Sequence, residues 1–164
     1  SEVENIQELN KDEILDKLDA IYEISRDISY DRLTPPHEDF SIKLASMFNS
    51  YKSDHRSIQC EGNHTSLWQD VNEVSKEEVF LVLQELLTNT DKHSGASEVT
   101  IRIWQEDEQI NIHYRDNGIG LADGQNFNNG LTNTVSRINA IAGTITFEAK
   151  NKKGLEVQIS FPTF

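Results

Sequence analysis

The sequence has one cysteine, no long apolar run and few basic residues. Cys60 alone cannot form an intramolecular disulfide, so the fold uses none, and a reducing compartment fits this composition. No stretch of about 18 apolar residues and no signal peptide is present, so no segment is expected to cross a membrane. Lys and Arg number 15 against 28 Asp and Glu, which sets the formal net charge at −13. This charge argues against nucleic acid as a partner, because phosphates demand a basic surface.

What is present is the composition of a folded domain. Hydrophobic residues make up 36% of the 164 residues and charged residues 26%, which excludes wholesale disorder. A chain of this length buries roughly 70% of its unfolded surface, so it needs neither disulfides nor a structural metal. The length suits one domain, with or without a helical appendage. Because the sequence begins with serine rather than methionine, we expect a fragment of a longer protein.

Residues 1 to about 33 are predicted to form a long helix. Mostly apolar residues recur along it at alternating steps of four and three, at Ile14, Leu18, Ile21, Ser25 and Ile28. Such a seam is typical of a helix that packs on another helix, although a helix packed on its own domain would show it too. Pro35 and Pro36 end this helix, because proline lacks the amide donor and restricts the residue before it.

The remaining residues, 37–164, carry the signals of an α+β domain. Helical periodicity predicts helices at residues 39–53, 75–93 and 131–142. Alternation of apolar and polar residues predicts strands around residues 58–60, 99–103, 110–114, 145–147 and 155–161. Ser75 is the expected N-cap of the middle helix, with Glu78 completing a capping box. Two hairpins with three helices predict a mixed sheet that is covered by helices on one face.

The helix at residues 75–93 has one polar face. At about 100° per residue, Glu85, Asn89 and Lys92 fall within an arc of about 60°, with His93 at its edge. A solvated polar face explains this pattern without any function. The residue types nevertheless suit phosphate chemistry: a carboxylate can accept a proton, an asparagine oxygen can bind Mg²⁺, and lysine or histidine can neutralise phosphate oxygens.

Two glycine-containing segments follow. The motif Asp116-Asn-Gly-Ile-Gly120 comes directly after a strand, and it is either a hairpin turn or a loop in which a carboxylate meets a purine amino group. No strand-like run follows it; residues 122–130 are rich in glycine and asparagine instead. Gly130-Leu131 then opens the last helix, which is either a simple junction or an anion site at a helix N-terminus.

The order of these segments resembles that of the GHKL ATPase family, which includes the catalytic domains of histidine kinases. The segment from Glu85 to His93 resembles its N box, the Asp116 motif its G1 box, and Gly130-Leu131 its G2 box. The Lys-His-Ser ending of the N box is closest to histidine kinases with the HisKA_3 type of dimerisation domain. Residues 25–36 resemble the end of the second helix of that domain. The resemblance therefore divides the chain into a dimerisation-helix remnant, 1–36, and an ATP-binding catalytic domain, 37–164.

The resemblance implies a Bergerat-type α/β sandwich that binds ATP with Mg²⁺ under a lid at residues 121–130. It implies that Asn89 holds Mg²⁺ and that Glu85 acts near the γ-phosphate as a base or polariser. Asp116 would accept a hydrogen bond from the adenine amino group. The residues expected to contact ATP are Asn89, Lys92, His93, Asp116, Gly118, Ile119, Gly120, Gly130 and Leu131. One departure is Gly154-Leu155, where the family usually has Gly-Thr, so a hydroxyl contact is lost there.

The resemblance also implies that the chain lacks its own phosphate acceptor. An acceptor histidine is expected on the first dimerisation helix, and none of the five histidines here has its acidic Leu-His setting. We therefore expect an ATP-dependent protein histidine kinase whose acceptor lies outside this chain. The expected partners are that histidine-bearing helix, a response regulator and, in the intact protein, a second copy. The intact protein is expected to be a bacterial, membrane-bound two-component sensor kinase, with this part in the cytoplasm.

Two alternatives remain open. The first is a serine kinase of the same ATPase family, of the anti-sigma-factor type, and transfer to a serine of a partner protein would favour it. The second is a non-catalytic module that binds a nucleotide or only dimerises. The loss of the Gly-Thr hydroxyl and the strong acidity of the chain favour this second alternative.

Overall fold

The computed structural model describes residues 14–24, 39–120, 129–148 and 153–164. The chain divides into two units, Ser1–Glu38 and Asp39–Phe164, and each is described by itself. In the first unit, residues 14–24 form a helix on which Leu18 and Ile21 are exposed. The predicted N-terminal helix is thus confirmed over these residues. The remainder of that prediction, with the two prolines, lies outside the described residues.

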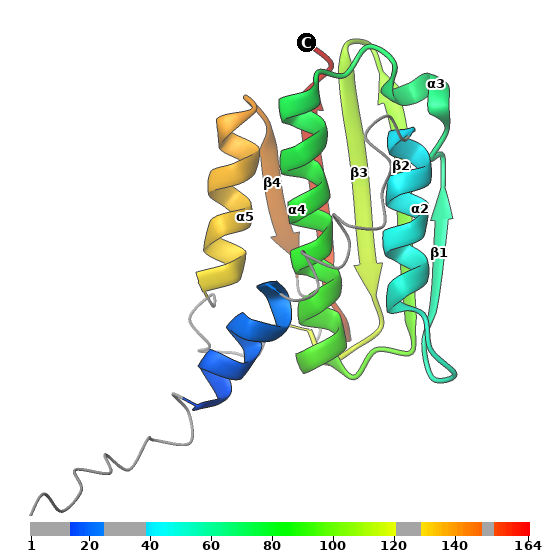
Figure 1. The fold of residues 1–164 in the computed structure, drawn as a ribbon. Coiled ribbons are helices and arrows are strands. Elements are labelled where there is room, and N and C mark those ends of the chain that lie inside the picture. The colour runs from blue at the N-terminus through cyan, green and yellow to red at the C-terminus, as the bar shows by residue number, and fades with distance from the viewer. Residues whose placement is uncertain (1–13, 25–38, 121–128, 149–152) are drawn as a thin grey trace, which may run out of the picture. The chain divides into compact units, whose positions relative to one another are not determined.

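Five strands form one mixed sheet in the second unit (Figure 1). They are β1 (Ser57–Glu61), β2 (Glu98–Glu106), β3 (Gln109–Asp116), β4 (Thr144–Glu148) and β5 (Glu156–Pro162). Their order across the sheet is β1-β2-β3-β5-β4, with β1 and β2 parallel and all other neighbours antiparallel. The predicted strand pairs β2–β3 and β4–β5 are confirmed, and the mixed sheet agrees with the predicted α+β class.

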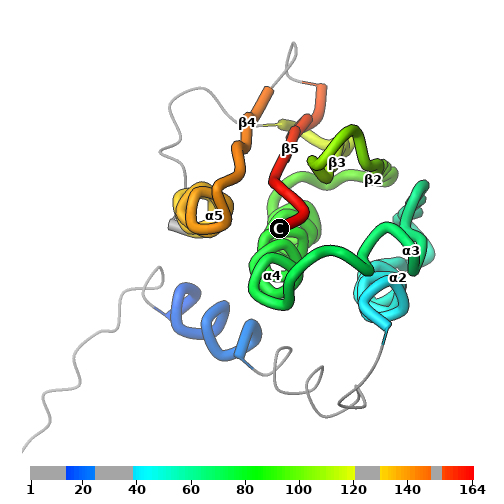
Figure 2. The backbone as a smooth tube through the Cα atoms, turned by 90° about the horizontal axis from the view of Figure 1, so that it is seen from above, coloured from blue at the N-terminus to red at the C-terminus, as the bar shows by residue number. Residues whose placement is uncertain are grey.

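Helices cover one face of this sheet. They are α2 (Phe40–Tyr51), α3 (Thr65–Trp68), α4 (Glu73–Asn89) and α5 (Asn129–Ala140), with a π-helical turn, η1 (Thr90–Ser94), that continues α4. Figure 2 shows α2, α4 and α5 along the same face of the strands. Within the described residues the other face carries no helix. Among those residues, too, every helix is too short or too polar to traverse a bilayer.

Alternation along the strands directs apolar side chains toward the helices. The buried positions include Ile101, Ile103, Ile110, Ile112, Val157, Ile159 and Phe161 on the strands, and Leu83, Leu86 and Leu87 on α4. Each such side chain contributes roughly 1.5–3 kcal/mol when it leaves water. This core holds α4 over the centre of the sheet, which brings its C-terminal end beside the end of β3.

The N-terminus of α4 is capped by Asn72, so the prediction of Ser75 as the cap is wrong. The side chain of Asn72 accepts a hydrogen bond from the backbone N–H of Ser75 at 2.9 Å, which satisfies one of the free amides of the first turn. Ser75 itself is buried inside that turn. Glu78, the expected capping-box partner, instead accepts from Arg137 of α5 at 2.9 Å and links the two helices.

The C-terminal end of α4 widens into the π-helical turn η1, which the sequence did not predict. Gly95 follows with a φ of 62° and closes the turn. Arg56 holds η1 from the start of β1: its Nη1 lies 2.5 Å from Oδ1 of Asp91, and its Nε donates to the carbonyl of Ala96 at 3.1 Å. Single π-helical turns are rare and frequently occur at functional sites.

The short helix α3 was not predicted either. Its first residue, Thr65, donates its hydroxyl to Oδ2 of Asp39 at 2.6 Å, so α3 is tied to the N-cap of α2. Trp68 at its end donates Nε1–H to Asn63 at 3.0 Å, and its ring packs edge-on against Phe40 with 4.7 Å between centroids. Contacts that are distant in sequence therefore hold this helix in place.

Candidate functional site

Asp116 ends β3 and is only 2% exposed. Its Oδ1 accepts from the backbone N–H of Gly118 at 2.9 Å and from that of Leu155 at 3.2 Å. Its Oδ2 accepts from the hydroxyl of Thr90 at 2.9 Å. The carboxylate predicted to meet a purine is therefore fixed by three donors from three separate segments.

The loop after Asp116 lies directly on η1. The N–H of Ile119 donates to the carbonyl of Ser94 at 2.9 Å. A Cβ built on Gly118 would lie 2.5 Å from both Cβ and the carbonyl oxygen of Ser94, so a side chain at this position would collide with the turn. Ile119 is 63% exposed, which leaves an apolar surface at the mouth of the loop. The predicted G1 and N boxes thus meet in space.

Asn117 explains why this loop is not a hairpin turn. Its Oδ1 accepts from the backbone N–H groups of Ser97 and Glu98, both at 2.9 Å, and its Nδ2 donates to the hydroxyl of Ser97 at 2.9 Å. The side chain therefore ties the loop to the start of β2. Of the two interpretations of this motif, the hairpin turn is excluded.

Gly120 and Gly154 form a second close approach next to Asp116. Both have positive φ, at 72° and 100°, which favours glycine. A Cβ on Gly120 would lie 2.8 Å from the carbonyl oxygen of Gly154, and a Cβ on Gly154 would overlap the carbonyl oxygen of Asp116. Glycine at both positions therefore lets these two backbone segments pack closely beside Asp116.

Glu85 and Asn89 lie on the same side of α4, and both are half-buried. The Nδ2 atom of Asn89 is buried and has no hydrogen-bond partner within the described part of the chain. A Cβ on Gly130, at the start of α5, would overlap Oε1 of Glu85, so the predicted N and G2 boxes are in contact. Leu131 follows Gly130 and is buried.

Lys92 and His93 lie in η1, beyond the regular α-helix. The predicted arc assumed an α-helical advance through residue 93, and a π-helical turn advances fewer degrees per residue because its hydrogen bonds span five residues. The arc therefore holds for Glu85 and Asn89 and does not extend to the two basic residues. Lys92 is half-buried and His93 is exposed.

Sequence reasoning missed Thr90 and Tyr114. The hydroxyl of Tyr114 lies 2.5 Å from Oγ1 of Thr90, which in turn donates to Asp116. Burial raises the pKa of the Tyr114 phenol well above its usual range, so the hydroxyl keeps its proton. A signal was available, because a tyrosine on the inward face of a strand needs a hydrogen-bonding partner when it is buried.

The chemistry of this set of residues fits a nucleotide with a divalent cation. Asp116 offers a buried acceptor, and glycines at 118, 120 and 154 let the backbone segments around it pack closely together. The unpaired atom of Asn89 is the donor Nδ2, which suits an acceptor such as a phosphate oxygen, since buried polar groups are normally paired. A divalent cation would need the Oδ1 of the same side chain. The described residues hold no group of three or more His, Cys, Asp or Glu that could bind a metal alone.

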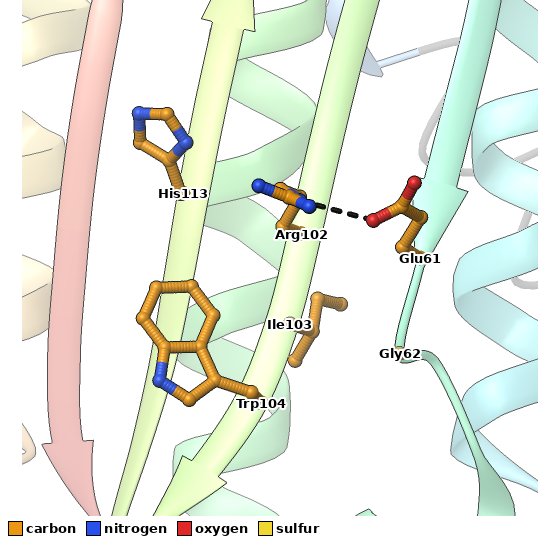
Figure 3. Close-up of a pocket in the computed structure, with 6 residues that line it drawn as sticks. All are labelled: Glu61, Gly62, Arg102, Ile103, Trp104 and His113. Carbon is orange, nitrogen blue, oxygen red and sulfur yellow. Dashed lines mark hydrogen bonds and ion pairs between the residues drawn. The ribbon is translucent and has the colours of Figure 1, made fainter.

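A separate hollow of about 440 Å³ lies on the helix-free face of the sheet (Figure 3). It is lined by Glu61, Gly62, Arg102, Ile103, Trp104 and His113. Nε of Arg102 donates to Glu61 at 3.0 Å across its floor. This hollow shares no residue with the motifs, whereas a small cavity of about 40 Å³ opens beside Asp116. The candidate site is therefore assigned to the side of α4 and α5 by the residue types found there, and not by the volume of the cavities.

The comparison with protein families gives one match. The sequence model described as "Histidine kinase-, DNA gyrase B-, and HSP90-like ATPase" matches residues 75–163, which is more than half of the chain.

Curated relatives are sensor kinases. The chain is 38% identical over 95 residues to the signal transduction histidine-protein kinase/phosphatase UhpB of Salmonella typhimurium, a match that covers 56% of this chain and 18% of that protein. It is 31% identical over 85 residues to the sensor histidine kinase ComP of Bacillus subtilis, covering 49% of this chain and 11% of that protein. The chain thus spans less than a fifth of the length of these relatives.

Solved structures share the fold. The histidine kinase AdeS of Acinetobacter baumannii matches with a TM-score of 0.60 and 16% identity, covering 99% of this chain and 88% of that one. The blue-light activated histidine kinase EL346 of Erythrobacter litoralis matches with a TM-score of 0.64 and 16% identity, covering 76% and 42%. Together with the family match over residues 75–163, the common fold shows that the chain belongs to the histidine kinase-, DNA gyrase B- and HSP90-like ATPases.

Proposed function

We propose that residues 37–164 bind ATP with Mg²⁺ and form the catalytic domain of a bacterial sensor histidine kinase. The observation that carries this proposal is the buried acceptor Asp116, which receives a hydrogen bond from Thr90. The residue before Thr90, Asn89, has an Nδ2 without a hydrogen-bond partner among the described residues. On this proposal, residues 1–36 are a remnant of the second helix of a dimerisation domain.

Each part of the site has a proposed role. Asp116 accepts from the adenine amino group, and Gly118, Ile119 and Gly120 flank the base. Asn89 provides an oxygen ligand for Mg²⁺. On the phosphate side we place Lys92, His93, Gly130 and Leu131.

We propose that the domain binds Mg²⁺ only when the nucleotide is bound. One asparagine oxygen is a weak site alone, and the described residues offer no cluster of acidic, histidine or cysteine side chains to complete it. Mg²⁺ prefers six oxygen ligands and keeps several waters, so the remaining ligands are phosphate oxygens and water. Removal of the nucleotide should therefore abolish metal binding.

The proposed reaction is transfer of the γ-phosphoryl group of ATP to a histidine that lies outside this chain. Such transfers depend mainly on positioning and on neutralisation of charge. Glu85 would take the proton of the acceptor or polarise it. Gly130 keeps this carboxylate against the start of α5, because any side chain at position 130 would displace it. Lys92 and His93 of η1 would donate hydrogen bonds to the phosphate oxygens.

The biological setting is also a proposal. The names of the relatives support a two-component pathway in which the phosphate passes from histidine to a response regulator. The exposed apolar residues of the helix at 14–24 support pairing with the histidine-bearing helix of a homodimer in the intact protein. We place this part of the protein in the cytoplasm, attached to a membrane-bound sensor.

Calorimetric titration of the purified chain with a non-hydrolysable ATP analogue tests the proposal. Binding in the micromolar to sub-millimolar range, stronger with Mg²⁺ and weaker for a GTP analogue, is expected. Circular dichroism on the same sample establishes that the chain is folded. A folded chain that binds neither analogue would overturn the proposal in favour of a module retained for dimerisation.

A further inference from the structure

We infer that Thr90, oriented by Tyr114, sets the purine selectivity of the candidate site by filling one acceptor position of Asp116, so that a single position remains open. This inference rests on the proposed function, because it concerns the base of the nucleotide that the site binds. Neither residue belongs to the set predicted to contact the nucleotide, and both lie beneath Asp116 in the core, where Thr90 is 1% exposed and Tyr114 is fully buried.

The first step is a count of acceptor positions. A carboxylate has about four lone-pair positions. Oδ1 of Asp116 receives two donors, the backbone N–H groups of Gly118 and Leu155, at 2.9 and 3.2 Å. Oδ2 receives one donor, the hydroxyl of Thr90, at 2.9 Å. Within the described residues, one position on Oδ2 is therefore left for a donor from outside the protein.

The second step is the direction of the hydrogen bonds. Thr90 has a single hydroxyl proton, and it donates that proton to Oδ2 of Asp116. Oγ1 of Thr90 must then accept from Tyr114, whose hydroxyl lies 2.5 Å away. The Tyr114 hydroxyl has a single proton, so the carbonyl of Leu86, which lies 3.4 Å away on α4, does not receive it when Thr90 does. The chain of donors runs from Tyr114 through Thr90 to Asp116.

The third step is the consequence for a bound base. A carboxylate with one open acceptor position attracts an N–H group, such as the amino group of adenine, and repels a carbonyl oxygen, such as that of guanine. With Thr90 removed, Oδ2 has a second open position and no side-chain anchor, so the carboxylate can rotate or take up water. Discrimination between the ATP and GTP analogues should then fall, while the stability of the fold changes less, because the backbone donors still hold Oδ1.

The chain supplies a matched control. Tyr51 of α2 and Thr88 of α4 form a second buried hydroxyl pair, 2.8 Å apart. Tyr51→Phe removes the same chemical group from the same core as Tyr114→Phe. A general effect of losing a buried phenol hydroxyl should appear in both variants. An effect that comes from a role in the site should appear in Tyr114→Phe alone.

The experiment measures, by calorimetry with Mg²⁺, the dissociation constant of a non-hydrolysable GTP analogue divided by that of the ATP analogue. For Thr90→Val we expect the ratio to fall by about fivefold, the factor that corresponds to the net worth of one hydrogen bond. Tyr114→Phe should give a smaller fall, Thr90→Ser should restore the wild-type ratio, and Tyr51→Phe should leave it unchanged.

Thermal melting of every variant establishes which ones are folded. If Thr90→Val does not fold, Tyr114→Phe against Tyr51→Phe still decides the question. An unchanged ratio in folded Thr90→Val or, failing that, equal ratios in the two tyrosine variants would overturn the inference while leaving ATP binding intact. Failure of the wild-type chain to bind either analogue would instead refute the proposed function.

Discussion

Gly154 is the position where a single added methyl group should damage both fold and site. It has a φ of 100°, and its Cβ would overlap the carbonyl oxygen of Asp116 in the backbone of β3. Gly95 offers the matched comparison, because it has a φ of 62° and a Cβ there would meet nothing within 4 Å. The two alanine substitutions therefore share backbone strain, and only one of them adds a steric clash.

The magnitudes follow from these two terms. A left-handed backbone costs a residue with a Cβ about 1–2 kcal/mol, which is the full expected loss for Gly95→Ala. Overpacking against a backbone that cannot yield adds about 1–3 kcal/mol, so Gly154→Ala should cost roughly 3 kcal/mol or more. Each kcal/mol lowers the Tm of a domain of this size by about 4 °C. The expected fall in Tm is therefore roughly 4–8 °C for Gly95→Ala and about 12 °C or more for Gly154→Ala.

Thermal unfolding followed by circular dichroism measures both variants under one buffer condition. Urea titration at a temperature where both are folded gives the free energy of unfolding independently. Because the clash displaces Asp116 and its bond from the Leu155 N–H, Gly154→Ala should also weaken binding of the ATP analogue. Equal losses of stability in the two variants would refute the steric argument.

Four further predictions concern single side chains. Asn89→Ala should abolish the Mg²⁺-dependent part of nucleotide binding with the fold intact, and an unchanged affinity in calorimetry would count against Asn89 as a metal ligand. Asp116→Asn should remove discrimination between ATP and GTP analogues, because an amide presents a donor as well as an acceptor; retained discrimination would place the adenine contact elsewhere. Glu85→Gln should preserve binding and lower phosphate transfer to a supplied histidine-bearing helix, and undiminished transfer would exclude Glu85 as the base. Burial raises the pKa of Cys60 to about 11, so alkylation at pH 8.5 should be many times slower in the folded chain than in urea, and equal rates would show that the thiol is not shielded.

The parts of the fold that depend on local patterns were predicted well. The helical periodicity that predicts a helix at residues 39–53 comes from Phe40, Leu44, Met47, Phe48 and Tyr51, and all five are buried in α2. Strands β2, β3 and β5 also bury the side chains that their alternation indicated, whereas Ile145 and Phe147 of β4 are only half-buried. Burial on one face imposes a period on the sequence, and a period can be detected without knowledge of the partner.

The parts that depend on distant contacts were not predicted. The π-helical turn is held by Arg56, which lies 35 residues before its partner Asp91. The hydrogen bond from Thr90 to Asp116 joins residues 26 apart. Such pairs leave no periodic trace, because each residue is a plausible surface or core residue until its partner is known. The N-cap of α4 was predicted wrongly for another reason. Both Asn72 and Ser75 are good N-caps, and the local sequence does not distinguish between them.

The two tryptophans give the domain an intrinsic fluorescence signal. Trp68 is 1% exposed and lies against Phe40, whereas Trp104 is 44% exposed on the helix-free face. On unfolding, the indole of Trp68 passes from an apolar surrounding into water, whereas that of Trp104 is already exposed to solvent in the folded state. The red shift of emission therefore reports the integrity of the α2–α3 corner, and neither indole belongs to the residues proposed to touch nucleotide. Tryptophan emission can thus follow unfolding as a signal that is separate from ligand binding in the same sample.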